Sequence, residues 1–360
     1  MAIDLFPLSN STGHFINFRG VANESGAPPP VSEVRPGLTR CSIFHEPWWL
    51  NAVTGGDWHL AKVVEKNEVL GEMPYTLVRK GFWNVSEMPL LTRCLGPVIR
   101  STTGSADEQW RHRFNVCNKL IQQLPACALF EQLMDPSMSE AEAIAFTFSR
   151  FKVFANFTLR ISPQQTEADT WAHMRPNTRN VIRRASEQLT VKEILSADEF
   201  VRFYDANLAA RQQRNMYGSS LMRTLLGEVM ERRAGKLLGC YDKDGTLQAA
   251  ITVVSDNTAL YYFLSSRKRD SHSGAISVLI WTAIRLAHER KLVFDFDGIA
   301  SLSILMFLSG FGGTLVRRFE IRRMRSDYAA FRKLHRSTQA IIESAGHRLH
   351  RAKDGDSAAG

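Results

Sequence analysis

Residues 293–313 read VFDFDGIASLSILMFLSGFGG, and this stretch decides how the rest of the chain is interpreted. Apolar and acidic residues alternate at its start, which predicts a β-strand, and the apolar run that follows predicts a helix. Successive side chains of a strand point to opposite faces, so Asp295 and Asp297 are expected on one face and the two phenylalanines beside them on the other. Two carboxylates next to an apolar core raise one another's proton affinity. The stretch therefore predicts a strand and a helix that present a pair of acids.

The segments before this stretch repeat one order of elements in both halves of the chain. Each half is expected to contain a hairpin, a strand, a helix, a strand, a second helix and a final strand. In the first half we predict strands at 41–45, 58–66, 69–80, 126–134 and 153–161, and helices at 46–53, 105–124 and 137–151. In the second half we predict strands at 190–195, 236–242, 247–255, 258–266, 292–298 and 314–324, and helices within 197–234 and at 273–291 and 301–310. Ser105 is a plausible cap for the helix that it begins.

The fold class expected from this pattern is α/β, with two units of mixed sheet packed side by side. A connecting helix at 168–189, with Pro176 near its first turn, joins them. We predict a flexible extension at 1–37, a first domain at 38–165, a second and catalytic domain at 166–330, and a basic C-terminal helix and tail at 331–360.

Composition and charge limit the class of protein. A chain of 360 residues is long for a single core, and its net charge of +9 permits contact with phosphates, anionic sugars or RNA. The five cysteines are scattered without a CxxC pair, and no apolar run approaches the length of a membrane-spanning helix. With no signal-peptide pattern at the N-terminus, these features predict a soluble cytoplasmic protein without a transmembrane segment.

Several site motifs are absent from the sequence. It contains no GxSxG elbow and no Walker lysine loop. SGFGG at 309–313 follows a predicted helix rather than a strand, so it is not a dinucleotide fingerprint. The histidines form no HxxxH or HxH pair, which argues against a metal enzyme. No metal cofactor and no contact with DNA are predicted.

The chain resembles the GNAT acyltransferase superfamily, and more narrowly its FemAB-like branch of tandem GNAT folds. Five pieces in order carry the resemblance, FHEPWWLNAV (44–53), MPLLTRCLGPVIR (88–100), MRPNTRNVIRRASE (174–187), SGAISVLIWTAIRLAHE (273–289) and FDFDGIASLSILMFLSGFGG (294–313). The resemblance implies transfer of an acyl group to an amine, with acyl-CoA or aminoacyl-tRNA as donor. It also implies an acceptor among cell-wall precursors or the amino sugars of surface polysaccharides.

The sequence departs from the family pattern at two places. CoA-dependent GNAT enzymes carry R-x-x-G-x-G/A before the long helix, whereas RKRDSHSGAIS at 267–277 has one glycine, Gly274. The FemAB pattern favours Phe-Lys ahead of its Phe-Gly, and here the pair is Phe307-Leu308. A role for that lysine therefore cannot be transferred to this chain.

Acyl transfer to an amine requires a base, and we predict that Asp295 or Asp297 is the base or the amine anchor. The alternative is that one of them caps the helix near Ser301 while the other pairs with an arginine. The resemblance implies that strand 259–266 exposes backbone amides to the thioester carbonyl, and that Tyr262 could protonate the leaving thiolate. Strand alternation predicts that Tyr262 and Leu264 lie on the same face of this strand. The alternative for Tyr262 is a buried tyrosine with one hydrogen bond.

The segment before the helix at 273–291 is a candidate donor site, because a helix N-terminus favours phosphate and the loop is basic. Its expected contacts with acyl-CoA are Leu264, Ser265, Ser266, Arg267, Arg269, Ser273, Gly274 and Ala275. A solvated basic loop is the alternative. On the connecting helix, Arg179 and Arg183 share one face and could bind an anionic substrate in the groove between the halves, or merely solubilise that face.

The sequence is compatible with three functions. The first is an N-acyltransferase that moves an acyl group from acyl-CoA to an amine of a cell-envelope glycan precursor. The second is an aminoacyltransferase that takes its acyl group from charged tRNA. The third is an inactive GNAT repeat that only binds a glycan or a protein.

Overall fold

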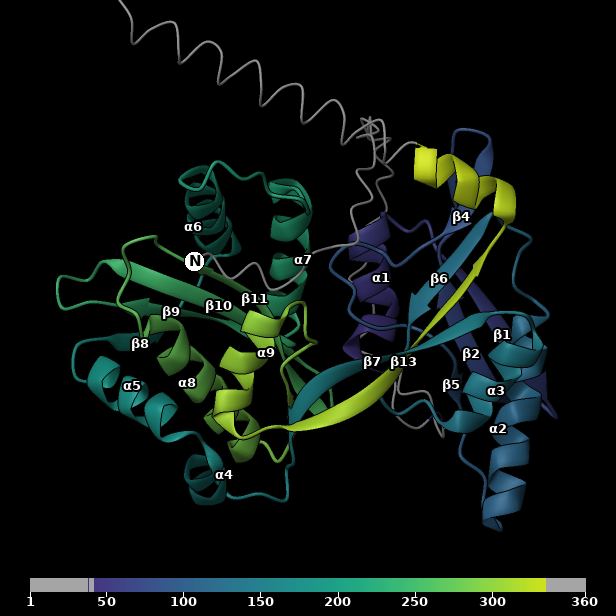
Figure 1. The fold of residues 1–360 in the computed structure, drawn as a ribbon, viewed down its shortest axis with the longest axis horizontal. Coiled ribbons are helices and arrows are strands. Elements are labelled where there is room, and N and C mark those ends of the chain that lie inside the picture. Colours follow the sequence, from purple (N-terminus) through teal and green to yellow (C-terminus); the bar gives the residue numbers. More distant parts are fainter. Residues whose placement is uncertain (1–37, 39–41, 335–360) are drawn as a thin grey trace, which may run out of the picture.

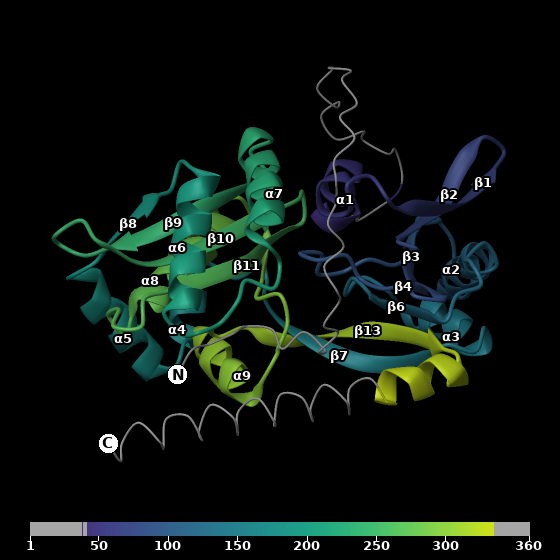
Figure 2. The same ribbon diagram turned by 90° about the horizontal axis from the view of Figure 1, so that it is seen from above.

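The computed structural model describes residues 38 and 42–334 of the chain. Two α/β units lie side by side, the one from the second half on the left of Figure 1 and the one from the first half on the right. A long two-stranded ribbon runs between them (Figure 2). Within the described residues, no helix combines the length and apolar character needed to cross a bilayer.

The first half contains most of the predicted elements. They are α1 (Pro47–Thr54), β1 (His59–Glu65), β2 (Glu68–Tyr75), β3 (Val78–Lys80), β4 (Trp83–Ser86), β5 (Val98–Ile99), α2 (Ala106–Ile121), β6 (Leu129–Leu133), α3 (Glu140–Phe148) and β7 (Lys152–Ile161). Ser105 caps α2 in a capping box with Glu108, as predicted. The predicted strand at 41–45 is wrong, because Ile43–His45 forms a 3₁₀ helix whose three side chains are all buried, without the alternation of a strand.

The second half follows the predicted order closely. It contains α4 (Glu167–His173), α5 (Pro176–Ser186), β8 (Thr190–Glu193), α6 (Ala197–Ala209), α7 (Ser219–Glu231), β9 (Gly235–Tyr241), β10 (Leu247–Ser255), β11 (Ala259–Arg267), α8 (Ala275–Glu289), β12 (Val293–Asp295), α9 (Leu302–Leu308), η2 (Ser309–Phe311) and β13 (Thr314–Met324). The single connecting helix is wrong. Met174 and Arg175 are extended and separate α4 from α5, because a residue that precedes proline disfavours the helical conformation.

The two halves exchange their last strands. One ten-stranded sheet runs β3-β4-β6-β13-β7-β12-β11-β10-β9-β8, and β1, β2 and β5 form a separate sheet. β13, the last strand of the second half, therefore lies beside β6 of the first half, and β7 of the first half lies beside β12 of the second. The division into domains at residues 165 and 166 stays a prediction, but each unit's sheet includes a strand from the other half.

Helices cover both faces of the sheet in the second unit (Figure 1). On one face, α5, α8 and α9 bury a core that includes Tyr262, Phe294 and Phe296. On the other face, α1, α6 and α7 bury a core that includes Tyr261 and Phe263. A further helix at 326–334 follows β13, while the rest of the predicted basic tail lies outside the described residues.

Candidate functional site

The site is built where β11 and β12 part. The two parallel strands pair from Ala259↔Val293 to Tyr261↔Asp295, after which β12 ends and β11 continues to Arg267. A register shift between Thr252 and Val253 of β10 places a bulge in β11 at the same level. Beyond the third pair, no strand among the described residues lies beside this edge of β11.

The bulge changes which side chains of β11 share a face. Leu264 packs in the same core as Tyr261 and Phe263, whereas simple alternation predicts it beside Tyr262. The backbone N–H of Leu264 donates to the hydroxyl of Thr252 at 3.1 Å. This amide, one of those expected to polarise a thioester carbonyl, therefore already has an intramolecular partner.

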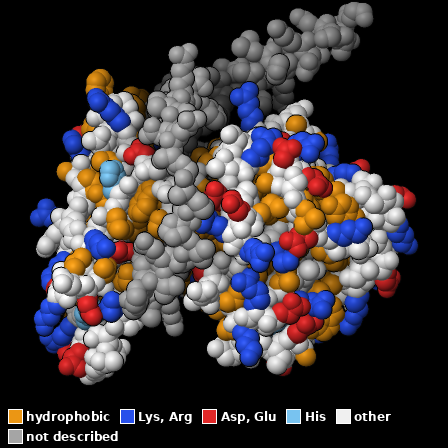
Figure 3. All heavy atoms as spheres, turned by 180° about the vertical axis from the view of Figure 1, so that it is seen from behind, with side chains coloured by type: hydrophobic (Ala, Val, Ile, Leu, Met, Phe, Trp, Pro, Cys, Tyr) orange, Lys and Arg blue, Asp and Glu red, His pale blue; other side chains and the backbone are white. Residues whose placement is uncertain are grey.

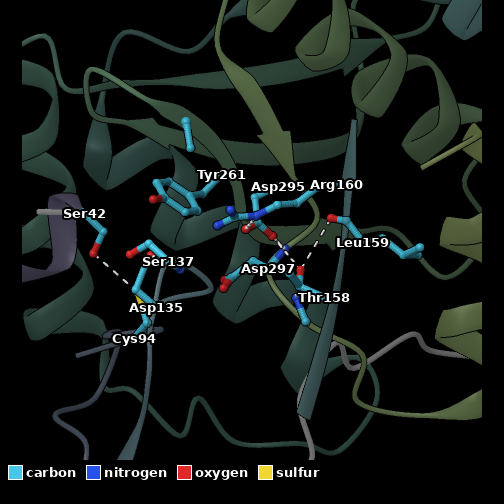
Figure 4. Close-up of polar contacts among 12 residues, drawn as sticks. Ser42, Cys94, Asp135, Ser137, Thr158, Leu159, Arg160, Tyr261, Asp295 and Asp297 are labelled. Carbon is cyan, nitrogen blue, oxygen red and sulfur yellow. Dashed lines mark hydrogen bonds and ion pairs between the residues drawn. The ribbon is translucent and has the colours of Figure 1, made fainter. Parts of the chain in front are cut away.

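Asp295 is the last residue of β12 and accepts three hydrogen bonds. Its carboxylate accepts from the Thr158 hydroxyl at 2.6 Å, from Nε of Arg160 at 2.6 Å and from the backbone N–H of Asp297 at 2.8 Å. The side chain is buried, and both side-chain partners come from β7 of the first half (Figure 4). Asp295 therefore ties the end of β12 to the exchanged strand.

Asp297 lies two residues beyond the end of β12 in a left-handed conformation, with φ of 61°. Aspartate tolerates this region better than most residues, and such conformations gather at functional sites. Its Oδ2 lies 2.7 Å from Nε of Arg93 in a buried ion pair. Burial raises the pKa of Asp297 to about 7, against the opposing charge of Arg93. A carboxyl with such a pKa suits a general base at neutral pH.

Arg93 spans the gap between the parting strands. It belongs to the loop between β4 and β5 in the first half, and its side chain is 8% exposed. Besides the ion pair to Asp297 after β12, its Nη2 donates to the carbonyl oxygen of Phe263 on β11 at 2.9 Å. The guanidinium also lies 5.0 Å from the centre of the Phe263 ring, a cation–π distance. The first unit thus supplies a side chain that holds the two strands of the second.

The same junction contains further polar groups of the first half (Figure 4). The thiol of Cys94 lies 3.3 Å from the Ser42 hydroxyl and 3.7 Å from Oδ2 of Asp135. Burial, with the charge of Asp135, raises the pKa of Cys94 well above its usual range, so the thiol stays protonated. On the second half's side, the Tyr261 hydroxyl donates to Asp256 at 3.0 Å.

Tyr262 is not brought together with the two aspartates. It packs among residues of the α8 face, on the side of the sheet opposite to Tyr261, and is 2% exposed. Burial raises the pKa of Tyr262, against a hydrogen bond with Ser265. This placement matches the alternative of a core tyrosine. Its role as a proton donor stays a prediction.

The predicted donor segment follows β11 and leads into α8. Ser266 accepts from Asn207 Nδ2 at 3.2 Å, and the carbonyl of Arg267 accepts from Arg211 at 2.6 Å, while Arg269 and Ser273 are exposed. Gly274 precedes the first residue of α8, Ala275. A Cβ at Gly274 would lie 2.6 Å from Cβ of Ala185, so this glycine is needed where α5 packs against α8.

Arg179 and Arg183 lie on α5, which packs beside α8 on the side of the second unit away from the first (Figure 1). Arg179 donates to the carbonyl of Ala172 at 3.1 Å at the end of α4, and Arg183 lies 5.4 Å from the centre of the Trp171 ring. The structure therefore places them at the α4–α5 corner and does not bring them together with the aspartates.

The sequence reasoning missed the arginines that complete the site. Arg93 and Arg160 lie within segments that carry no other charge, TRCLG at 92–96 and TLRI at 158–161. An arginine in such a segment was the sequence signal that could have identified them as buried and paired. Long charged side chains in buried segments are usually paired. The pairing of each aspartate with an arginine partly matches the alternative given for them, in which one of the two pairs with an arginine. Helix α9, in contrast, is capped by Ser301 itself. Within the described residues, no cluster of His, Cys, Asp and Glu could hold a metal ion.

Comparison with known proteins identifies the fold. Residues 172–301 match the family model described as an acetyltransferase (GNAT) domain. The chain is similar in structure to FemX, with a TM-score of 0.59 and 10% identity over 78% of this chain and 92% of that one. It is also similar to the C-terminal domain (DUF2156) of a putative lysylphosphatidylglycerol synthetase from Agrobacterium fabrum, with a TM-score of 0.49 and 14% identity over 79% and 89% of the two chains. No curated protein matches the sequence.

These findings confirm the predicted class, a mixed α/β chain of tandem GNAT-like folds. The matched segment runs from α4 through the parting of β11 and β12 to Ser301, and so includes both aspartates. The chain therefore has a fold similar to that of FemX, and its residues 172–301 match the GNAT acetyltransferase domain.

Proposed function

We propose that the protein is an N-acyltransferase that moves an acyl group from acyl-CoA to an amine of a cell-envelope polysaccharide or cell-wall precursor. The observation that supports it most is the parting of β11 and β12 with Asp295 and Asp297 buried at its base. A gap between two parallel strands can admit an extended thioester, and a carboxyl with a pKa of about 7 can accept the proton of an amine.

In this reaction the amine nitrogen bonds to the thioester carbonyl carbon and the C–S bond breaks. The proton released by the amine passes to the Asp297 carboxylate, and the CoA thiolate leaves to be protonated as a thiol. Arg93 positions Asp297 across the gap, and Asp295 with Arg160 holds the turn on which Asp297 sits. Pre-positioning of this kind is worth orders of magnitude in rate.

The donor would be held by residues 264–275. The N-terminus of α8 and the basic side chains of Arg267 and Arg269 fit a phosphorylated group at this end of the gap. Acetyl-CoA supplies an activated acyl group when bound. The cytoplasm, where acyl-CoA is made, is the expected location.

Aminoacyl-tRNA is the second candidate donor, and two observations favour it. Gly274, the single glycine of the donor loop, packs against α5, so it is required for that helix contact rather than for binding a pyrophosphate. The net charge of +9 also suits a polyanion. Against it, Lys and Arg are interspersed with Asp and Glu on the face shown in Figure 3, without a continuous basic track.

A thermal-shift and transfer experiment tests the proposal on the full chain. Acetyl-CoA should raise the melting temperature, and the purified protein should release free CoA thiol when an amine acceptor is added. A rise with charged tRNA alone would favour the second donor. If neither donor shifts a folded protein and no thiol is released, the chain is a binding module and the proposal fails.

A further inference from the structure

One buried cation in the junction is left over after the ion pairs are formed. Arg318 lies on β13 and is 7% exposed. Among the described residues its side chain makes no hydrogen bond and no ion pair, and its Nε is a buried donor without an acceptor. A buried guanidinium is normally compensated by an oxyanion, because an unpaired buried charge is costly.

The side chain of Arg318 faces the site rather than a separate part of the fold. Residues directly opposite each other on neighbouring strands share a face, and Arg318 pairs with Asn156 of β7. It therefore lies on the same face of the ribbon as Thr158 and Arg160, which contact Asp295. Its charge acts on both Asp297 and Cys94.

The carboxylates around Arg318 are already engaged or stand apart. Asp295 pairs with Arg160 and Asp297 pairs with Arg93. Asp135 follows Met134, whose N–H donates to the Phe319 carbonyl at 2.7 Å, so Asp135 lies at the level of Arg318. Yet Asp135 makes no ion pair with a described residue and accepts from the Ser137 N–H and the Cys94 thiol.

We propose that Arg318 binds an oxyanion carried by the acceptor, a carboxylate or a phosphate, and so selects amines that bear such a group near the reacting nitrogen. Planar guanidinium groups recognise both oxyanions with two parallel hydrogen bonds. Asp135, of opposite charge and at the same level, would face the ammonium end of such a molecule. Arg160 is 20% exposed and Asp135 is half-buried, so the junction reaches solvent.

This inference rests on the proposed function, because that function identifies the bound molecule as the acceptor. The test itself needs no acyl donor. Calorimetric titration of the full chain would use three matched amines: phosphoethanolamine with a phosphate, β-alanine with a carboxylate, and ethanolamine with neither. We expect one anionic amine to bind about tenfold more tightly than ethanolamine, since a charge-assisted hydrogen bond is worth that much. Whether phosphoethanolamine or β-alanine is preferred identifies the oxyanion.

Variants assign the preference to Arg318. Arg318→Gln should remove it, whereas Arg317→Gln, the neighbouring exposed residue paired with Glu140, should retain it. If Arg318→Gln does not fold, Arg318→Lys keeps the charge but loses the planar fork and should weaken the preference. Equal binding of all three amines, undetectable binding of all three, or a preference that persists in both Arg318 variants would overturn the inference.

The two proposals fail separately. Acyl transfer to amines irrespective of an anionic group would overturn the role of Arg318 and leave the transferase intact. Anion binding through Arg318 in a protein that neither binds nor cleaves acetyl-CoA would leave the site and remove the proposed reaction.

Discussion

Each half of the molecule contains a strand, a long helix and a second strand parallel to the first, but the two pairs part differently. In the first half, β4 and β6 pair at Val85↔Leu129 and Ser86↔Phe130, and the chain itself then fills the gap. The N–H of Leu95 donates to the Leu133 carbonyl at 2.8 Å, and Leu95 forms a parallel bridge with Met134. Backbone beside β6 leaves no free edge there.

In the second half, the gap between β11 and β12 is bridged by a side chain. Arg93 reaches the Phe263 carbonyl and Asp297, and it lies two residues before Leu95 on the same loop. The same loop of the first half thus fills the gap between β4 and β6 with its backbone and bridges the gap between β11 and β12 with the Arg93 guanidinium. The difference explains why the acids and the proposed chemistry belong to the second half.

The largest expected effect is on turnover. Asp297→Asn keeps a residue that tolerates positive φ but cannot accept a proton, so kcat should fall by about 10²–10⁴-fold with folding intact. Initial rates of thiol release, with the melting temperature as control, measure this. Unchanged turnover would show that Asp297 is not the general base and that the acids do not give the second half a catalytic role that the first half lacks.

Arg93→Met tests the bridge between the halves. Removal of one partner leaves Asp297 buried without its cation, which should cost about 3–5 kcal/mol of unfolding free energy. Because Arg93 lowers the pKa of Asp297, the rising limb of the pH–rate profile should also move to higher pH. Denaturant titration and a pH series check both, with exposed Arg79→Met as control.

The double variant Arg93→Met with Asp297→Asn should recover part of that loss, since no unpaired carboxylate remains. If the double variant loses as much unfolding free energy as the two single variants together, the ion pair does not hold the strands.

Gly96→Ala tests how the first half closes its parting. Gly96 has φ of +113°, and a Cβ there would lie 2.1 Å from Sδ of Met134. Strain of this kind costs about 1–3 kcal/mol, and displacement of the loop should also lower activity through Arg93. Gly81→Ala, at φ of +61° with nothing within 4 Å of the new Cβ, is the matched control and should leave activity unchanged.

The smallest effect is on the pH dependence of stability. The pKa of Asp297 rises from its ordinary value of 3.8 to about 7 on folding, so the folded state binds more protons between these values. Its contribution to stability is complete below the lower value and is lost as pH rises through the upper one. Melting temperatures from pH 5 to 8 should fall less in Asp297→Asn than in Asp244→Asn, an exposed control. If melting temperature falls equally steeply with pH in both variants, a group other than Asp297 titrates in this range.

The sequence alone determined most of the elements and predicted the acidic pair. Alternation in residues 293–298 predicted both aspartates opposite Phe294 and Phe296, whose rings meet edge to face at 4.8 Å in a buried core. It did so because hydrophobic periodicity is local and records which face of an element is buried. The predicted strand is too long, because β12 ends at Asp295 and Asp297 lies in the turn beyond it. The same reasoning failed where geometry is not periodic, in the 3₁₀ turn at Ile43–His45 and at the bulge before Leu264.

Only the tertiary structure decided the partners of the acids. Arg160 is 135 residues from Asp295 in sequence, Arg93 belongs to the other half, and Arg318 lies on a strand exchanged between the units. No local pattern specifies such pairs, because an ion pair depends on which segments the sheet order brings together. The stretch at 293–313 therefore predicted a pair of acids at a strand end, and the exchange of β7 and β13 decided which cations meet them.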